Sequence, residues 1–506
     1  MEAVEFVLNG APVSVPSEGT LLSALRDRLG VRSAKDGCAP QGQCGCCTVL
    51  VDGEPRVACV TPVSRVAGRV VTTLEGVDDD VRQGWADALC ATGGSQCGFC
   101  TPGIIMRLLD VEPVKADVER ALLAHMCRCT GWQTIVEGAV DRPQRRERDL
   151  DAAAERARIE GGASQRVAPH VALGRGGFAD DSAPSDSLVA ILAPSGEWVV
   201  ASSVSEARQL AGVVPGRRST VGLTWPIDVP DDRQHEFVRT LRTTWVEPAY
   251  LEPDAVWCVP GGEPVGPLTN GGAFGGKTTQ WLRDETRRLA DEHDRPMRIV
   301  LSREDVVRRG AKRPPLAAGV RANGSGVLWV RTTPGVRELV ASVAPDWEVI
   351  EVDVPGPPTS LGLRAAVWAE IAVLKASITD HDRVVAPNGA WAEASSSGDG
   401  VSVRVGCGDA LDDVTLRSYC IGAAHMALGW VRNEGIAVDA RGTVHDLTIR
   451  SFGVLRAVDT PAIHIEVVDD GSAVRNVSDA VFAAVAAAEW RRAEFAPRWP
   501  CARDGR

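Results

Sequence analysis

The chain has 506 residues, with 67 acidic and 55 basic side chains and a formal net charge of −12. This acidic balance argues against nucleic acid or an anionic membrane as a general partner, because either would require a basic face. Ten of the 14 cysteines precede residue 130, which is typical of a metal-binding module joined to a cytoplasmic body rather than of a secreted disulfide framework. The chain opens on acidic residues and has no apolar run long enough to span a bilayer, so we expect a cytoplasmic protein.

The first 76 residues predict a small β-grasp domain. Asn9-Gly10 is typical of a two-residue hairpin turn, and Thr20 suits the N-cap of a helix over 21–29. Short apolar runs predict five strands, at 4–8, 12–15, 48–51, 56–60 and 70–74.

The pattern then becomes helical, and a small helical bundle is expected over residues 77–141. Its predicted helices are 81–91, 102–111, 115–125 and 131–139. The charged, Ala-rich segment 142–166 is interpreted as a solvated linker. The remainder, 167–506, alternates β-rich runs with helices, so the whole chain is predicted to be α+β.

Two groups of cysteines carry the chemistry. The N-terminal cysteine set, Cys38, Cys44, Cys47 and Cys59, has the spacing C-x5-C-x2-C-x11-C on a glycine-rich loop. Three thiolates on such a loop can wrap one side of a [2Fe–2S] cluster, and the fourth comes from the next hairpin. A structural zinc site is the alternative. Cys46 lies next to Cys47 in the sequence, so a ligand set that uses Cys46 instead also remains open.

The helical cysteine set consists of Cys97, Cys100, Cys127 and Cys129, arranged as C-x2-C and C-x-C. Thiolates one residue apart rarely fit a zinc tetrahedron, so this spacing also favours an iron–sulfur cluster.

Three motifs together resemble a known family. CAPQGQCGCCT at 38–48, QCGFCTPG at 96–103 and CRCTGW at 127–132 are similar to the iron–sulfur part of the xanthine oxidase/aldehyde oxidase/carbon monoxide dehydrogenase family. The resemblance implies a plant-type ferredoxin domain at 1–76 and a helical cluster domain at 77–141. It also implies that each cysteine set holds one [2Fe–2S] cluster. The helical cluster would lie nearer to a molybdenum centre, and the N-terminal cluster would pass electrons outward to FAD.

The glycine loop NGGAFGGK at 270–277 resembles a loop of the same family's molybdenum–pterin subunit. The resemblance implies a set of residues that bind this cofactor: Gly272, Phe274, Gly275, Gly276, Arg364 and Gly422. The same stretch also satisfies the P-loop pattern G-x4-G-K-[ST]. However, Pro264 and Pro267 precede it where a P-loop needs a buried strand.

The region 167–506 departs from the family because it is too short for a full molybdenum subunit. Only 36 residues separate Glu370 from Cys407. In addition, the glutamate that the family carries near the C-terminal end of its molybdenum subunit has no counterpart at the matching position of this chain. Glu466 and Asp479 are acids near that place, but nothing in the sequence marks either as a base, so the catalytic residues are unknown. A lone histidine such as His125 or His425 is more simply interpreted as a residue packed against its neighbours than as a catalytic or cluster-tuning group. We therefore expect a contracted molybdopterin-binding-like domain.

The predicted function is an iron–sulfur electron-transfer component of a molybdenum hydroxylase. Its partners would be a subunit that binds FAD and possibly a full-length molybdenum subunit. The complex would act on a small aldehyde or heterocycle. Two alternatives remain: a self-contained hydroxylase with an unrecognised base, and a non-catalytic iron–sulfur interaction or redox-sensing protein.

Overall fold

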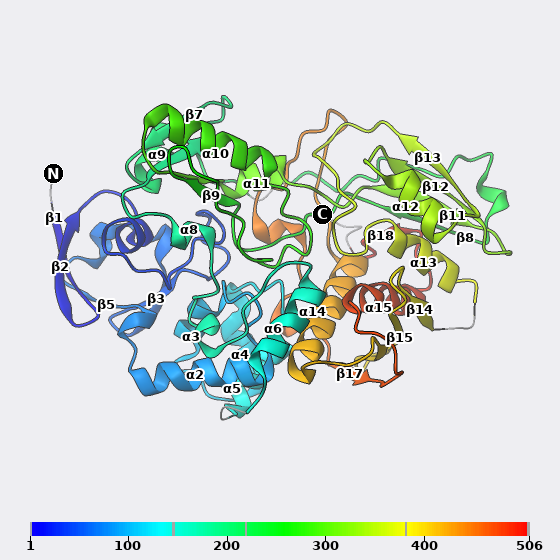
Figure 1. Ribbon diagram of the computed structural model, residues 1–506, viewed down its shortest axis with the longest axis horizontal. Coiled ribbons are helices and arrows are strands. Elements are labelled where there is room, and N and C mark those ends of the chain that lie inside the picture. Colours follow the sequence, from blue (N-terminus) through cyan, green and yellow to red (C-terminus); the bar gives the residue numbers. More distant parts are fainter. Residues whose placement is uncertain (1–2, 144–146, 218–219, 380–381, 503–506) are drawn as a thin grey trace.

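The computed structural model describes residues 3–143, 147–217, 220–379 and 382–502. The predicted α+β architecture is confirmed, with the N-terminal sheet at one end of the molecule and sheets of the C-terminal region at the other (Figure 1). No helix among the described residues is both long and apolar enough to cross a bilayer.

The N-terminal sheet has five strands in the order β2-β1-β5-β3-β4. Strand β1 pairs antiparallel with β2 and parallel with β5, as expected of a β-grasp sheet. Thr20 forms a capping box with Ser23 at the start of the single helix, which continues as a π-helical turn over Ala24–Arg28. The bounds are β1 Ala3–Leu8, β2 Ala11–Pro16, α1 Leu21–Ser23, β3 Thr48–Val51, β4 Glu54–Val57 and β5 Val70–Thr72.

The next region is helical, as predicted. Its helices are α2 Asp79–Thr92, α3 Thr101–Leu108, α4 Lys115–Ala121 and α5 Gln133–Asp141. Helix α2 packs against α5, and Gly94 allows the close approach because a β-carbon there would lie 2.8 Å from the Thr134 carbonyl oxygen. The two loops that carry the helical cysteine set join α2 to α3 and α4 to α5.

The prediction of a solvated linker over 142–166 is wrong for residues 150–161. Residues Leu150–Gly161 form helix α6, which is capped by the Asp149 side chain and packs against α14 (Asp413–Arg432). Ala153 and Ala157 are completely buried and allow the close packing of the two helices. Arg156 and Glu160 lie on the same buried face, where they form an ion pair at 2.8 Å.

The C-terminal region contains three further sheets, in the orders β7-β6-β10-β9, β13-β12-β11-β8-β18 and β14-β15-β16-β17. The strands are β6 Leu188–Leu192, β7 Trp198–Ala201, β8 Arg239–Thr243, β9 Ala255–Cys258, β10 Met297–Val300, β11 Leu316–Val320, β12 Gly326–Arg331, β13 Trp347–Val352, β14 Arg383–Val385, β15 Trp391–Ser396, β16 Val401–Gly406, β17 Ile463–Val467 and β18 Arg498–Trp499. The remaining helices are α7 Pro169–Ala172, α8 Ala179–Ser182, α9 Val204–Leu210, α10 Gln280–His293, α11 Arg303–Arg309, α12 Val336–Val343, α13 Trp368–Ala376 and α15 Ser478–Arg492.

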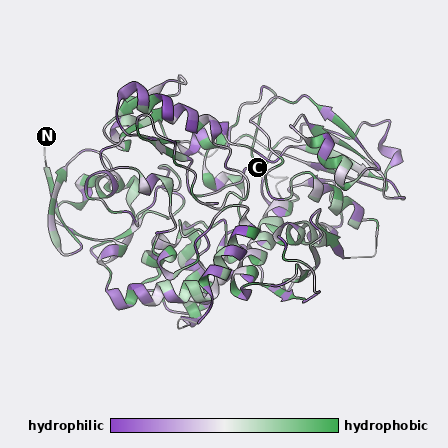
Figure 2. Ribbon diagram, viewed as in Figure 1, coloured by the Kyte–Doolittle hydropathy of each residue, from purple (hydrophilic) through white to green (hydrophobic). Residues whose placement is uncertain are grey.

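Helices α14 and α15 form the centre of this region. They pack against each other, and α15 also covers β15. Helix α14 is buried along most of its length, whereas the peripheral α10 carries many hydrophilic residues (Figure 2). A helix that is apolar on all sides belongs in a core, so α14 and α15 fix the position of the loops around them.

Candidate functional site

The helical cysteine set converges in two pairs. The Cys97 and Cys129 Sγ atoms are 3.6 Å apart. Cys100 faces Cys127, and their hydrogen bond lowers the pKa of the Cys127 thiol to about 6 despite its burial. A lowered pKa favours the thiolate, which is the form that binds metal.

The thiols of the N-terminal cysteine set are linked in a row: Cys44 contacts Cys38, Cys38 contacts Cys59, and Cys59 contacts Cys47. The backbone N–H of Gln41 donates to the Cys38 Sγ at 3.1 Å, and the hydrogen bond from Cys44 holds the pKa of the Cys38 thiol well below its usual value.

Cys46 is completely buried and lies beside Cys44, whereas Cys47 is the thiol that faces Cys59. The Cys59 thiol contacts Cys47, and the Cys59 N–H donates to the Cys47 Sγ at 3.4 Å, which favours Cys47 rather than Cys46 as the ligand. Cys46 is left as a fifth buried thiol next to the set.

Paired thiols suit a two-iron cluster, in which each iron takes two cysteine sulfurs. Among the described residues, no group of three or more His, Cys, Asp or Glu side chains surrounds a single point as a metal ion would require. All eight predicted ligands are at most 5% exposed, and backbone N–H groups donate to the Cys38 and Cys47 sulfurs. The residues present therefore fit two [2Fe–2S] clusters.

The loops that carry the two sets touch each other. The Met126 N–H donates to the Cys44 carbonyl oxygen at 3.0 Å. Gly45 has a φ of 74°, and a β-carbon there would clash with the ring of His125. His125 is thus a packed residue between the loops, and burial lowers its pKa to about 4.

A cavity of about 720 Å³ lies beside the glycine loop 270–277. Three of the residues implied by the family resemblance line it, namely Phe274, Gly275 and Arg364. The other three are packing glycines: a β-carbon at Gly272 would lie 3.1 Å from the Cys129 Sγ, one at Gly276 would lie 2.8 Å from Pro248, and one at Gly422 would clash with the Cys129 carbonyl oxygen. The cavity and the helical cysteine set are therefore neighbours through Gly272.

Arg364 is a buried cation of this cavity, which the buried Lys277 also lines. Its guanidinium lies 3.8 Å from the centre of the Phe274 ring and its Nε is 3.4 Å from the Asp479 Oδ1. Among the described residues its Nη2 has no hydrogen-bond partner, and burial lowers its pKa. A buried donor without a partner is costly, so this corner of the cavity fits an anionic group such as that of a pterin cofactor.

The two acids identified near the C-terminus are separated by the fold. Asp479, in the first turn of α15, lines the cavity, and burial raises the pKa of its carboxyl group. Glu466 lies on the exposed side of β17 and pairs with Arg404 at 3.3 Å.

The P-loop alternative is wrong for this chain. Residues 259–268 form no strand, and the Lys277 Nζ is engaged by the Glu252 carboxylate at 2.7 Å.

Sequence reasoning missed Glu160, which lines the same cavity. Its carboxylate accepts hydrogen bonds from the backbone N–H groups of Val477 and Ser478 and from the Ser478 hydroxyl group. It therefore fixes the start of α15 and, with it, Asp479. The Asp149 cap and the spacing of Ala153 and Ala157 were signals of this helix, but the high charge of the segment concealed them.

Comparison with known proteins agrees with this geometry. Residues 73–140 match the family model of a [2Fe-2S] binding domain. The chain is 38% identical over 140 residues to the isoquinoline 1-oxidoreductase subunit alpha of Brevundimonas diminuta, covering 26% of this chain and 91% of that protein. It is 39% identical over 153 residues to the xanthine dehydrogenase of Drosophila subobscura, covering 26% of this chain but only 11% of the length of that relative.

The fold of the whole chain is similar to that of the aldehyde oxidoreductase from Desulfovibrio gigas, with a TM-score of 0.69, 14% identity, and coverage of 100% of this chain and 99% of that chain. The matching motifs, the paired thiols and these relatives lead to one conclusion: the chain belongs to the xanthine oxidase/aldehyde oxidase/carbon monoxide dehydrogenase family of molybdenum hydroxylases.

Proposed function

We propose that this chain is an iron–sulfur electron-transfer component of a molybdenum hydroxylase. The helical cysteine set would hold one [2Fe–2S] cluster and the N-terminal cysteine set the other, in domains over 77–141 and 1–76. The observation that carries this proposal is the clustering of eight buried thiols in two sets, whose loops are joined by the hydrogen bond from Met126 to Cys44.

The cavity supplies the inner end of this path. Phe274, Gly275 and Arg364 would hold a molybdenum–pterin group there, with Arg364 donating to its anionic part. When bound, the group supplies the two-electron oxidation of a substrate C–H bond. Gly272 brings the cavity wall against Cys129, so electrons would pass to the helical cluster and then to the N-terminal cluster. An FAD-binding subunit would accept them. A full-length molybdenum subunit is a further candidate partner, and the substrate would be an aldehyde or heterocycle.

Metal analysis and EPR spectroscopy test the proposal. The purified chain is expected to contain about four iron atoms and to give two distinct signals from reduced [2Fe–2S] clusters after dithionite treatment. Zinc in place of iron, or a single signal, would contradict it.

A second candidate function is a self-contained hydroxylase, and Asp479 is the observation that favours it. This carboxyl group lines the cavity beside Arg364, and burial raises its pKa, which suits a group that accepts a proton. Asp479→Asn is expected to abolish turnover of an aldehyde or purine while molybdenum and iron contents stay unchanged. Absence of molybdenum and pterin from the wild-type chain would dispose of this candidate.

A further inference from the structure

Arg450 ties the N-terminal cluster loop to two other parts of the chain. Its Nε donates to the Gln43 carbonyl oxygen at 2.8 Å, and its backbone N–H donates to the Gln43 side-chain oxygen at 3.3 Å. Its Nη2 reaches the Leu123 carbonyl oxygen at 3.0 Å, just before the loop of Cys127. Arg450 therefore connects the residue before Cys44 with the helical region.

The neighbouring segment holds the same loop by neutral contacts. The Gln41 side-chain amide donates to the Leu447 carbonyl oxygen at 2.8 Å, and its oxygen accepts from the Ile449 N–H at 3.3 Å. The position of the loop thus depends on several hydrogen bonds. Some of these also involve charged groups, because Gln41 donates to the Glu304 carboxylate at 2.8 Å and the Arg303 guanidinium donates to the Gly37 carbonyl oxygen.

The charge of Arg450 is not cancelled by a carboxylate among the described residues. The oxygens to which it donates are neutral, and the ionisable groups that influence it electrostatically are the Cys44 and Cys38 thiols and Arg456. By contrast, the exposed Arg456 forms a two-pronged ion pair with Asp459, at 2.6 and 3.0 Å.

We propose that Arg450 is a positioning residue that raises the reduction potential of the N-terminal cluster relative to the helical cluster. This inference rests on the two-cluster function proposed above. Reduction adds one electron, and therefore one negative charge, to a cluster that is already anionic. A nearby uncancelled cation stabilises the reduced form more than the oxidised form. Transfer of an electron from the helical cluster to the N-terminal cluster thereby becomes thermodynamically more favourable.

The test is an EPR-monitored redox titration of the full chain at low ionic strength. Arg450→Gln is expected to shift the midpoint potential of the N-terminal cluster to a more negative value and to leave that of the helical cluster unchanged. Arg450→Lys keeps the charge, so its potential is expected to stay near the wild-type value. The double variant Arg456→Gln/Asp459→Asn is the matched control and is expected to shift neither potential, because it removes an ion pair with no net charge.

Ionic strength gives a second measurement that needs no variant. The Debye length falls from about 10 Å at 0.1 M salt to about 3 Å at 1 M salt, so an exposed charge is screened. The gap between the two wild-type potentials is expected to narrow as salt is added, and the gap in Arg450→Gln is expected to respond less. If Arg450→Gln does not assemble the N-terminal cluster, the proposal is tested instead by the wild-type salt titration and by the potentials of Arg450→Lys.

The proposal is overturned if Arg450→Gln keeps the wild-type potentials at low salt, if both clusters shift equally, or if Arg450→Lys behaves like Arg450→Gln. Wild-type iron content and the presence of two EPR signals are measured first. A failure there overturns the two-cluster function, whereas two normal signals with unchanged potentials overturn only the role of Arg450.

Discussion

The backbone N–H of Met126 donates a hydrogen bond of 3.0 Å to the carbonyl oxygen of Cys44. Cys44 is a predicted ligand of the N-terminal cluster, and Met126 directly precedes Cys127, a predicted ligand of the helical cluster. The two loops therefore meet through one hydrogen bond between segments 82 residues apart in the sequence. Gly45 makes this contact possible, because a side chain there would collide with His125.

Substitution of the adjacent residues Cys46 and Cys47 shows which of their two thiols is a ligand of the N-terminal cluster. Cys47→Ser is expected to lower the iron content from about four to about two atoms per chain, since one cluster would lose a ligand that faces Cys59. Cys46→Ala is expected to keep about four, because Cys46 lies beside Cys44 and the Cys59 thiol contacts Cys38 and Cys47 instead. Iron analysis checks both, and the reverse pattern would assign the ligand to Cys46.

The buried ion pair between Arg128 and Glu434 holds the loop of Cys127 and Cys129. Its two hydrogen bonds are 2.7 and 2.8 Å long, and the side chains are 3% and 1% exposed. Glu434→Gln leaves a buried guanidinium uncompensated and is expected to lower the free energy of unfolding by about 3–5 kcal/mol. Urea unfolding measures this change. The double variant Arg128→Met/Glu434→Leu removes both charges and should cost less; an equal or larger loss would contradict this account.

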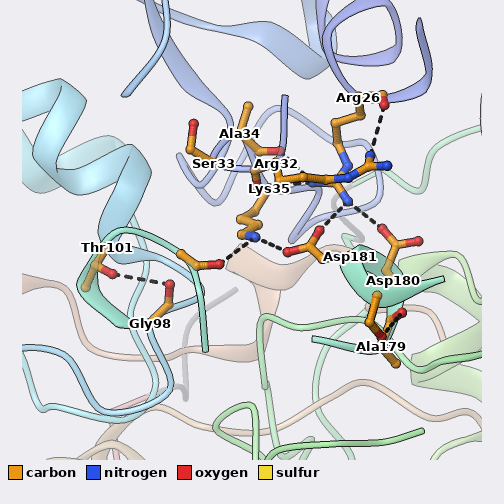
Figure 3. Close-up of polar contacts among 12 residues, drawn as sticks. Arg26, Arg32, Ser33, Ala34, Lys35, Gly98, Thr101, Ala179, Asp180 and Asp181 are labelled. Atoms are coloured by element: carbon orange, nitrogen blue, oxygen red, sulfur yellow. Dashed lines mark hydrogen bonds and ion pairs between the residues drawn. The ribbon is translucent and has the colours of Figure 1, made fainter. Parts of the chain in front are cut away.

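A second charged cluster joins the N-terminal domain to the segment around α8 (Figure 3). The Arg26 guanidinium contacts Asp180 at 2.7 Å and Asp181 at 2.8 Å, and Asp181 also pairs with the buried Lys35. Burial lowers the pKa of Lys35, so the ammonium depends on the Asp181 carboxylate. Asp181→Asn is expected to cost about 3 kcal/mol of stability.

Hydrogen exchange of residues 32–38 reports the local effect of Asp181→Asn, because Lys35 lies just before the loop of Cys38. Exchange in this segment is expected to accelerate. The control is Asp186→Asn, an exposed residue on the same stretch, which should leave the exchange unchanged. Equal exchange in both variants would show that the cluster does not anchor the loop.

Burial of His425 makes stability dependent on pH. This fully buried residue has its pKa lowered from 6.5 to about 3, chiefly by desolvation. Between these values the unfolded chain binds a proton that the folded chain does not. The contribution of the neutral, buried His425 to the free energy of unfolding is therefore fully present above pH 6.5. It is lost as the pH falls toward 3, by at most about 1.4 kcal/mol per pH unit.

His425→Gln is expected to flatten the pH dependence of the unfolding free energy in this window. Urea unfolding at a series of pH values measures it. The control His464→Gln, at an exposed position on β17, should retain the wild-type slope. An unchanged slope in His425→Gln would mean that other groups govern the acid sensitivity.

Local patterns were sufficient to predict much of the N-terminal third. Asn9-Gly10 specifies its hairpin, and Thr20 caps its helix through Ser23. Both signals act over a few residues, so they survive in any tertiary context. The charged segment at 142–166 failed as a linker prediction because its ion pair, Arg156–Glu160, is buried only when α14 covers it.

Cysteine spacing by itself indicated which neighbouring thiols lie together, as in Cys97 with Cys100 and Cys127 with Cys129, because a loop only a few residues long keeps its thiols close in any fold. Only the tertiary structure decided which thiols pair, that the two loops touch, and that Gly272 lies against Cys129 while Arg364 and Asp479 share a cavity. These contacts join residues far apart in the sequence. They depend on how α14, α15 and the glycine loop pack, and short-range patterns carry no information about that packing.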